Sequence, residues 1–267
     1  MTSSSPYDPP ERPGLRRMRR RRRRSMLLLA MLVAATGGAV GITRLSEPPR
    51  PARVPLAAAP TLMPDADTAL PASPTGYPTA GPGTFAVASG RSPVRGHDGP
   101  LRRYRVEVEQ GAGQDTDAFA AAVDAVLGDP RSWIASGRLR VQRVPEAATA
   151  DFTVYLATPA TSERMCAEGG LRTERYTSCR LPGRVVLNLA RWMTAVPDYG
   201  APLDVYRTYV INHEVGHEFG ESHQGCPRPG APAPVMQQQT YGLDGCVPNA
   251  WPYVDGMRYS GEPTDGV

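Results

Sequence analysis

Three histidines lie close together in the stretch HEVGHEFGESH at residues 213–223, and a glutamate directly follows the first of them. In an α-helix, residues four positions apart share one face, so His213 and His217 can direct ring nitrogens at a single metal ion. Gly220 adopts a positive φ at little cost, which would end the helix and turn the chain so that His223 supplies a third ligand. Three protein nitrogens leave the fourth position of a tetrahedral zinc site to water. The spacing therefore predicts a catalytic Zn²⁺ site.

Glu214 stands beside the first of these ligands and suits the role of general base. Bound zinc lowers the pKa of a water molecule to about 7, and a carboxylate at this position can accept the water proton and return it to a leaving amine. A bare HExxH also occurs in ordinary solvated helices, where the histidines would only lie on a polar surface. The extended HExxHxxGxxH is far stricter, and it favours the metal site.

The extended pattern resembles that of the metzincin zinc metallopeptidases, whose further mark is a methionine turn beneath the metal. The segment APAPVMQQQT places Met236 shortly after His223, in the order of that clan. The resemblance implies an α+β fold, in which a mixed twisted sheet is combined with a backing helix, an active-site helix and a small irregular C-terminal subdomain. It also implies a zinc-dependent endopeptidase.

The chain departs from the metzincin pattern at two positions. Gln224 follows the third histidine, where subfamilies carry other characteristic residues, and Gln238 stands where some of them place a tyrosine as an extra metal ligand. Tyr241 and Tyr253 are possible substitutes, although each also suits a partly buried aromatic residue.

A second resemblance rests on the segments YVINHEVGH, PVMQQQT and NAWP. Together they are similar to an uncharacterised family of secreted or anchored proteins of high-GC, actinobacterial bacteria, over roughly residues 100–252. This similarity supports the metzincin-like domain but implies no substrate.

The positive charge of the chain is concentrated at its N-terminus. Residues 1–43 hold 9 Arg and 2 acidic residues, a net charge of +7, whereas residues 44–267 hold 21 Arg and 24 acidic residues, a net charge of −3. An unbroken arginine run, residues 19–24, adjoins an apolar segment free of charge at residues 26–42. This arrangement indicates a membrane-targeting signal and argues against a nucleic-acid partner.

The apolar segment predicts a single-pass anchor in the cell membrane. Its 17 residues would rise about 25 Å as a helix, which is short for a bilayer, and the arginines would hold residues 1–25 in the cytoplasm as a basic tail. The catalytic part would then be extracellular. The alternative is a cleaved signal peptide that releases the protein, for which only weak cleavage sites appear around residues 39–41.

Residues 43–94 are rich in proline, alanine and other small residues, so they predict an extended, disordered stalk. A propeptide is the competing interpretation, and TFAVASG from Thr84 also suits an early strand. Residues 95–255 would form the zinc peptidase domain, with a frayed tail at residues 256–267.

Four cysteines agree with export to an oxidising compartment. Sequential pairing, Cys166 with Cys179 and Cys226 with Cys246, is the simplest of three connectivities, and the second bridge would hold the methionine turn. A rival interpretation makes Cys226 a zinc thiolate, which would close the water position.

Hydrophobic periodicity predicts the elements that must position the site. Alternation at Tyr104, Val106 and Val108 indicates a strand with one buried face, and a helix should run from a cap at Asp115 or Thr116 to Gly128. Further strands are expected at residues 139–144, 152–158 and 185–192, followed by a helix from about Leu203 that carries the metal ligands. The resemblance to metzincins also implies an exposed strand above this helix that holds an extended peptide by main-chain hydrogen bonds, for which residues 185–189 are the candidate.

These features predict an exported zinc endopeptidase that acts on a peptide or protein. A second possibility is a hydrolase of cell-wall peptides or amides that uses the same metal site. A third is a non-catalytic cell-envelope binding module braced by zinc, which Glu214 argues against because bracing needs no base.

Overall fold

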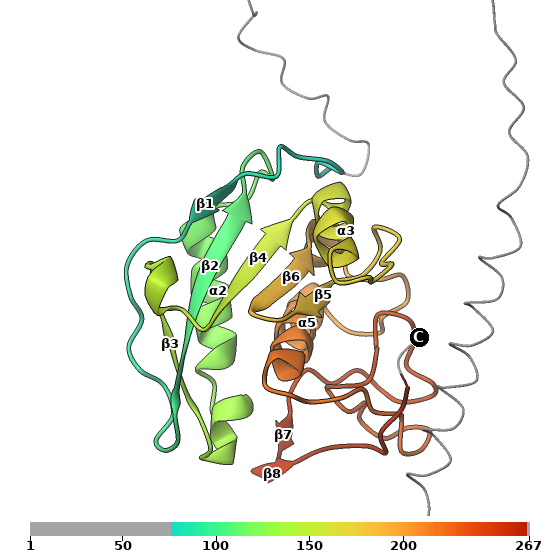
Figure 1. Ribbon diagram of the computed structural model, residues 1–267. Helices are drawn as coiled ribbons and strands as arrows, with labels where there is room; N and C mark the ends of the chain where they lie inside the picture. The colour runs from blue at the N-terminus through green and yellow to red at the C-terminus, as the bar shows by residue number, and fades with distance from the viewer. Residues whose placement is uncertain (1–75, 266–267) are drawn as a thin grey trace, which may run out of the picture. The chain divides into compact units, whose positions relative to one another are not determined.

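The computed structural model describes residues 76–265 (Figure 1). The predicted basic tail, the membrane anchor at residues 26–42 and most of the stalk lie outside the described residues. Within residues 76–265, none of the helices has the length and apolar character needed to cross a bilayer.

A six-stranded mixed sheet forms the centre of the domain (Figure 1). The strand order is β1-β2-β4-β6-β5, and β3 pairs with β2. Strands β2, β3, β4 and β6 are parallel, while β1 and β5 run antiparallel to their neighbours. The strands span β1 (Phe85–Val87), β2 (Leu101–Glu109), β3 (Arg140–Arg143), β4 (Phe152–Ala157), β5 (Cys179–Leu181) and β6 (Arg184–Asn188).

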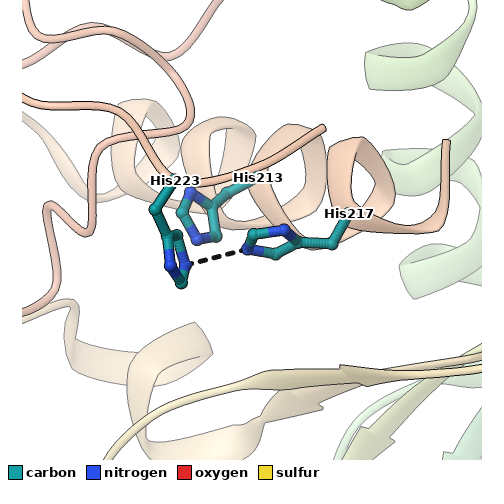
Figure 2. A group of neighbouring side chains, drawn as sticks. All are labelled: His213, His217 and His223. Atoms are coloured by element: carbon teal, nitrogen blue, oxygen red, sulfur yellow. Dashed lines mark hydrogen bonds between the residues drawn. The ribbon is translucent and has the colours of Figure 1, made fainter. Parts of the chain in front are cut away.

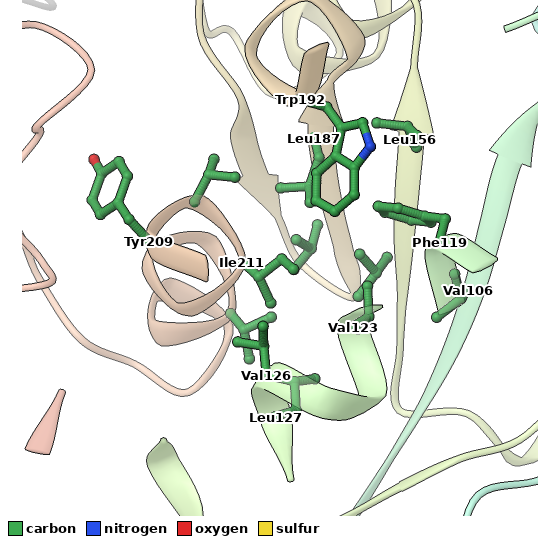
Figure 3. Close-up of a cluster of buried hydrophobic side chains, with 14 of the residues drawn as sticks. Val106, Phe119, Val123, Val126, Leu127, Leu156, Leu187, Trp192, Tyr209 and Ile211 are labelled. Carbon is green, nitrogen blue, oxygen red and sulfur yellow. The ribbon is translucent and has the colours of Figure 1, made fainter. Parts of the chain in front are cut away.

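The face of the sheet that carries Tyr104, Val106 and Val108 is covered by two helices, and these three side chains are buried as predicted. Helix α2 (Thr116–Leu127) begins at the predicted cap, where the Asp115 carboxylate accepts a hydrogen bond from Ala118 N. Helix α5 (Leu203–Glu218) packs beside it. The core between them and the sheet includes the buried side chains of Phe119, Val123, Leu156, Leu187, Trp192 and Ile211 (Figure 3).

The opposite face of the sheet is also partly covered, contrary to the one buried face that alternation suggests. Helix α3 (Pro159–Ala167) lies there, and Glu109 at the end of β2 is only 1% exposed. The Glu109 carboxylate accepts hydrogen bonds from Gly83 N, Thr158 N and Thr161 Oγ1 at 2.7–2.8 Å. These three donors offset the cost of removing the charge from water.

The predicted α+β class with a mixed sheet is confirmed, and three local predictions are wrong. Residues 185–192 are not one strand, because β6 ends at Asn188, whose side chain accepts from Ala190 N and caps helix α4 (Leu189–Thr194). Residues 76–94 are not part of a stalk: the early strand that TFAVASG suggests is present as β1, which pairs with β2. Residues 256–265 do not form a frayed tail: strands β7 (Tyr253–Val254) and β8 (Met257–Arg258) form a hairpin, and the chain beyond them packs on residues 223–225.

Two disulfides join the predicted partners. Cys166 in α3 is bonded to Cys179 in β5, and Cys226 is bonded to Cys246 across the irregular C-terminal part. Both sulfurs of the second bridge are therefore occupied, which rules out Cys226 as a zinc thiolate.

Removing the Cys226–Cys246 bridge should destabilise the protein. Loop-closure entropy assigns about 3 kcal/mol to a bridge between cysteines 20 residues apart. We expect Cys226→Ser/Cys246→Ser to lower the free energy of unfolding by that amount, measured by urea denaturation. The matched control is Cys166→Ser/Cys179→Ser, whose separation of 13 residues predicts a similar loss. An unchanged free energy in both variants would contradict the entropic argument.

Candidate metal centre

Helix α5 is locked against its surroundings by a fully buried asparagine that precedes the first histidine. Asn212 Oδ1 accepts from Ser132 Oγ at 2.8 Å, its Nδ2 donates to Ala250 O at 2.9 Å, and its backbone carbonyl accepts from Trp133 Nε1 at 2.9 Å. Val210, Ile211 and Val215 of α5 are buried in the core. The rotation of α5 about its axis is thereby fixed, and the face with the histidines turns away from the core.

The structure brings together the three predicted ligands (Figure 2). His213 and His217 come from α5, and His223 comes from the turn after it. The Nε2 atoms of His217 and His223 lie 3.0 Å apart, and one ligand nitrogen from each ring lies within 4.8 Å of the other two. A spacing of 3.0 Å suits two nitrogens bonded to one zinc ion at about 2.0–2.1 Å each.

Backbone carbonyls orient two of the rings. His213 Nδ1 donates to Val235 O and His217 Nδ1 donates to Glu221 O, each at 2.8 Å. A proton on Nδ1 leaves the Nε2 lone pair available to a metal, and such outer partners commonly accompany metal-binding histidines. The second carbonyl is in place because Gly220 has a φ of +95° and turns the chain back.

Burial favours the form of these histidines that binds metal. Desolvation lowers the pKa of His213 and His217, and desolvation together with the nearby His217 lowers the pKa of His223 to about 4. The imidazoles are therefore neutral at physiological pH. The donor set of three neutral imidazole nitrogens fits Zn²⁺ better than Mg²⁺ or Ca²⁺, which prefer oxygen.

The site opens into a cleft of about 920 Å³. Glu214 is one of its lining residues, is 6% exposed, and has a pKa that burial raises to about 8. A bound divalent cation would lower this pKa, because it favours the charged carboxylate. The walls facing α5 comprise residues 170–173, residues 177–180, Gln238, Thr240, Tyr241, Thr264 and Asp265.

Met236 lies directly against α5. It is fully buried, and a Cβ atom placed on Gly216 would stand 2.5 Å from its Sδ and 2.6 Å from Trp133 Cζ2. The carbonyl of Val235, the residue before it, is the one that orients His213. The predicted methionine turn thus supports the helix at the level of the ligands.

Of the two tyrosines considered as extra ligands, only Tyr241 lines the cleft, with 52% of its surface exposed. Tyr253 is in β7 and is not among the lining residues. The sequence pattern did not single out Tyr209, which also lines the cleft. Its ring centre lies 5.3 Å from that of His213, and its hydroxyl donates to Gln237 O. Its place four residues before His213 is a signal that could have revealed it.

Gly216→Ala should destabilise the protein, even though alanine gains about 1 kcal/mol of helix propensity. Overpacking against Trp133 and Met236 costs about 1–3 kcal/mol, and Met236→Ala should cost about 2–5 kcal/mol through the cavity it leaves. In the double variant the new methyl group fills part of that cavity, so the combined loss should be smaller than the sum. Urea unfolding of the zinc-free chain measures this coupling, and strictly additive losses would show that the two residues do not meet.

The comparisons with known proteins give one match. Residues 71–254 match the family described as "Protein of unknown function (DUF3152)". No curated protein and no solved structure matches the chain. The matched residues include the sheet, helix α5, all three histidines and the methionine turn. Because the match covers more than half of the sequence, the chain belongs to this family of unknown function, DUF3152.

Proposed function

We propose that this protein is an exported, metzincin-like zinc endopeptidase, anchored through residues 26–42, whose metal is held by His213, His217 and His223. The observation that carries the proposal is the convergence of three neutral imidazoles, two of them oriented by carbonyls, at a cleft that also contains Glu214. A purely structural zinc site would be closed by a fourth protein ligand. Among the described residues, His213, His217 and His223 are the whole cluster.

Glu214 is suited to move a proton. It follows His213 directly, about 100° around the helix, so its carboxylate can face the reacting water without replacing a ligand. Bound zinc would supply Lewis-acid catalysis and lower the pKa of that water. The desolvated Glu214 would accept the proton, hold it inside the cleft and deliver it to the leaving nitrogen of the peptide.

The strand proposed for substrate binding requires a correction. Residues 185–189 are not an exposed edge, because β6 is hydrogen-bonded to β4 on one side and to β5 on the other. The edge strand on this side of the sheet is β5, which pairs only with β6 among the described strands. Cys179 and Arg180 of β5 also line the cleft. An extended peptide could therefore add to β5 by main-chain hydrogen bonds and pass in front of the metal centre.

An ion pair connects this edge strand, β5, to helix α5, which carries His213 and His217. Arg180 of β5 donates to Glu218 at 2.7 Å, and Glu218 directly follows the ligand His217. Glu218 also lies 3.5 Å from Arg102 of β2 and has only 5% of its side chain exposed. A substrate bound along β5 would thus have a defined position relative to the histidines.

The full-length protein should bind one zinc ion per chain. His213→Ala/His217→Ala should abolish binding, because one imidazole cannot hold the ion alone. The matched control is His97→Ala, which removes an exposed histidine outside the cluster and should leave the stoichiometry unchanged. Metal analysis after dialysis without chelator measures the result. Zinc retained by the double variant would overturn the assignment of the site.

Glu214→Gln should keep the zinc and the fold but lose nearly all peptide hydrolysis. Loss of a positioned base typically lowers the rate by about 10²- to 10⁴-fold. A peptide-library digest compares this variant with wild type and with Glu146→Gln, which removes a carboxylate exposed beside Arg91 and should have no effect.

Three outcomes would contradict parts of the proposal. Equal cleavage by wild type and Glu214→Gln would refute the role of the base. Cleavage of cell-wall fragments but not of peptide libraries would show that the substrate is a cell-wall peptide or amide and not an ordinary peptide. A zinc-loaded wild type that cleaves neither would favour the binding module.

A further inference from the structure

The end of the described chain runs beside the turn that carries the third histidine. Gly225 N donates to Glu262 O at 2.9 Å, and Thr264 N donates to His223 O at 3.0 Å. Gln224 and Pro263 form an antiparallel bridge between these two hydrogen bonds. A short two-stranded pairing therefore holds the backbone of His223 from one side.

Two glycines allow these segments to approach closely. A Cβ atom on Gly261 would stand 2.1 Å from Gly225 O, and one on Gly225 would stand 3.2 Å from Thr264 Cγ2. The first distance is far below a normal contact, so any side chain at Gly261 would push the two backbones apart.

The same C-terminal region also holds the beginning of the turn. Arg258 Nη2 donates to Glu221 Oε2 at 2.9 Å, and the Arg258 guanidinium lies 4.9 Å from the ring centre of Trp133. The backbone carbonyl of Glu221 is the group that accepts the His217 Nδ1 proton. Residues 257–265 thus contact Glu221, whose carbonyl orients the His217 ring, and also His223 itself.

His223 needs such support because it lies outside α5. His213 and His217 are positioned by the hydrogen bonds of a helix that is buried on one side, whereas the turn after Gly220 has no regular structure. On its inner side the turn is held by Gln224 N, which donates to Met236 O at 3.1 Å. On its outer side the support comes from residues 257–265, which follow the part of the chain matched by the family.

We propose that residues 257–265 form a C-terminal clamp that positions His223 and thereby sets the affinity of the site for zinc. Thr264 is the central positioning residue, because its N–H donates to the carbonyl of the ligand itself. The proposal rests on the metal site of the proposed function. Second-layer partners of metal ligands typically change metal affinity by about 10- to 100-fold, and a change of that size is expected here.

The test is a pair of substitutions at one position in the full-length protein. Thr264→Pro removes the N–H donor, while Thr264→Ala keeps it and removes only the side chain. Competition with a chromophoric chelator gives the zinc dissociation constant. We expect Thr264→Pro to weaken zinc binding by about 10- to 100-fold and Thr264→Ala to stay close to wild type.

A second variant tests the clamp by another route. Gly261→Ala displaces the segment without altering a donor, and it should weaken zinc binding in the same direction as Thr264→Pro. It also keeps the proposal testable if the proline variant does not fold. Thermal unfolding of the zinc-free variants separates positioning from general damage, because the clamp predicts a loss of zinc affinity with little change in their melting temperature.

Wild-type zinc affinity in both Thr264→Pro and Gly261→Ala would overturn the clamp, as would equal losses in Thr264→Pro and Thr264→Ala. A loss of affinity that merely parallels a lowered melting temperature would overturn it too. These outcomes concern metal binding alone. A wild type that binds zinc without hydrolysing peptides would refute the peptidase and leave the clamp standing.

Discussion

The close contact between helix α5 and the methionine turn is the constraint on which the candidate metal centre depends. Gly216 has no side chain, so Met236 and Trp133 can lie too close to the helix to leave room for a Cβ there. This approach brings the Val235 carbonyl within 2.8 Å of the His213 ring and the Met236 carbonyl within reach of Gln224. His213 in the helix and Gln224, the residue after His223, therefore both form hydrogen bonds to the same turn. A larger residue at Gly216 would separate both from their partners.

The C-terminal part keeps its shape with few regular elements because buried side-chain amides replace a hydrogen-bond ladder. Gln239 is 1% exposed, accepts from Tyr199 and donates to Asn249 O at 2.8 Å. Asn249 in turn donates to Ala233 O at 2.9 Å. Buried backbone carbonyls need partners, and these amides supply them inside an irregular loop. Together with the Cys226–Cys246 bridge, they explain how a segment with only a small hydrophobic cluster of its own can support the candidate metal site.

The candidate site thus combines residues of regular elements, the sheet and α5, with residues of an irregular turn. The sheet and α5 share one hydrophobic core, and the Glu218 ion pairs connect that core to the cleft wall at Arg180. His223 lies in a turn that is hydrogen-bonded to Met236 on one side and to residues 257–265 on the other. Affinity for a metal at this candidate site would therefore depend on residues far along the chain from the histidines.

The sequence by itself determined what is local. The spacing of His213 and His217 follows from the helical period, the cap at Asp115 follows from its side-chain oxygen, and the alternation at Tyr104, Val106 and Val108 follows from the pleat of a strand. Sequential cysteine pairing was the simplest connectivity and is the one observed.

Only the tertiary structure decided what depends on distant partners. Whether residues 185–189 form an edge or an inner strand depends on β5, a three-residue strand with too little pattern to be recognised. Asn188 begins a helix where continued hydrophobicity suggested a strand, because its side chain offers a cap. The contact of Thr264 with His223 joins residues about forty positions apart by backbone atoms, which leave no mark in side-chain chemistry. A sequence records its side chains, whereas main-chain hydrogen bonds between remote segments exist only once the chain has folded.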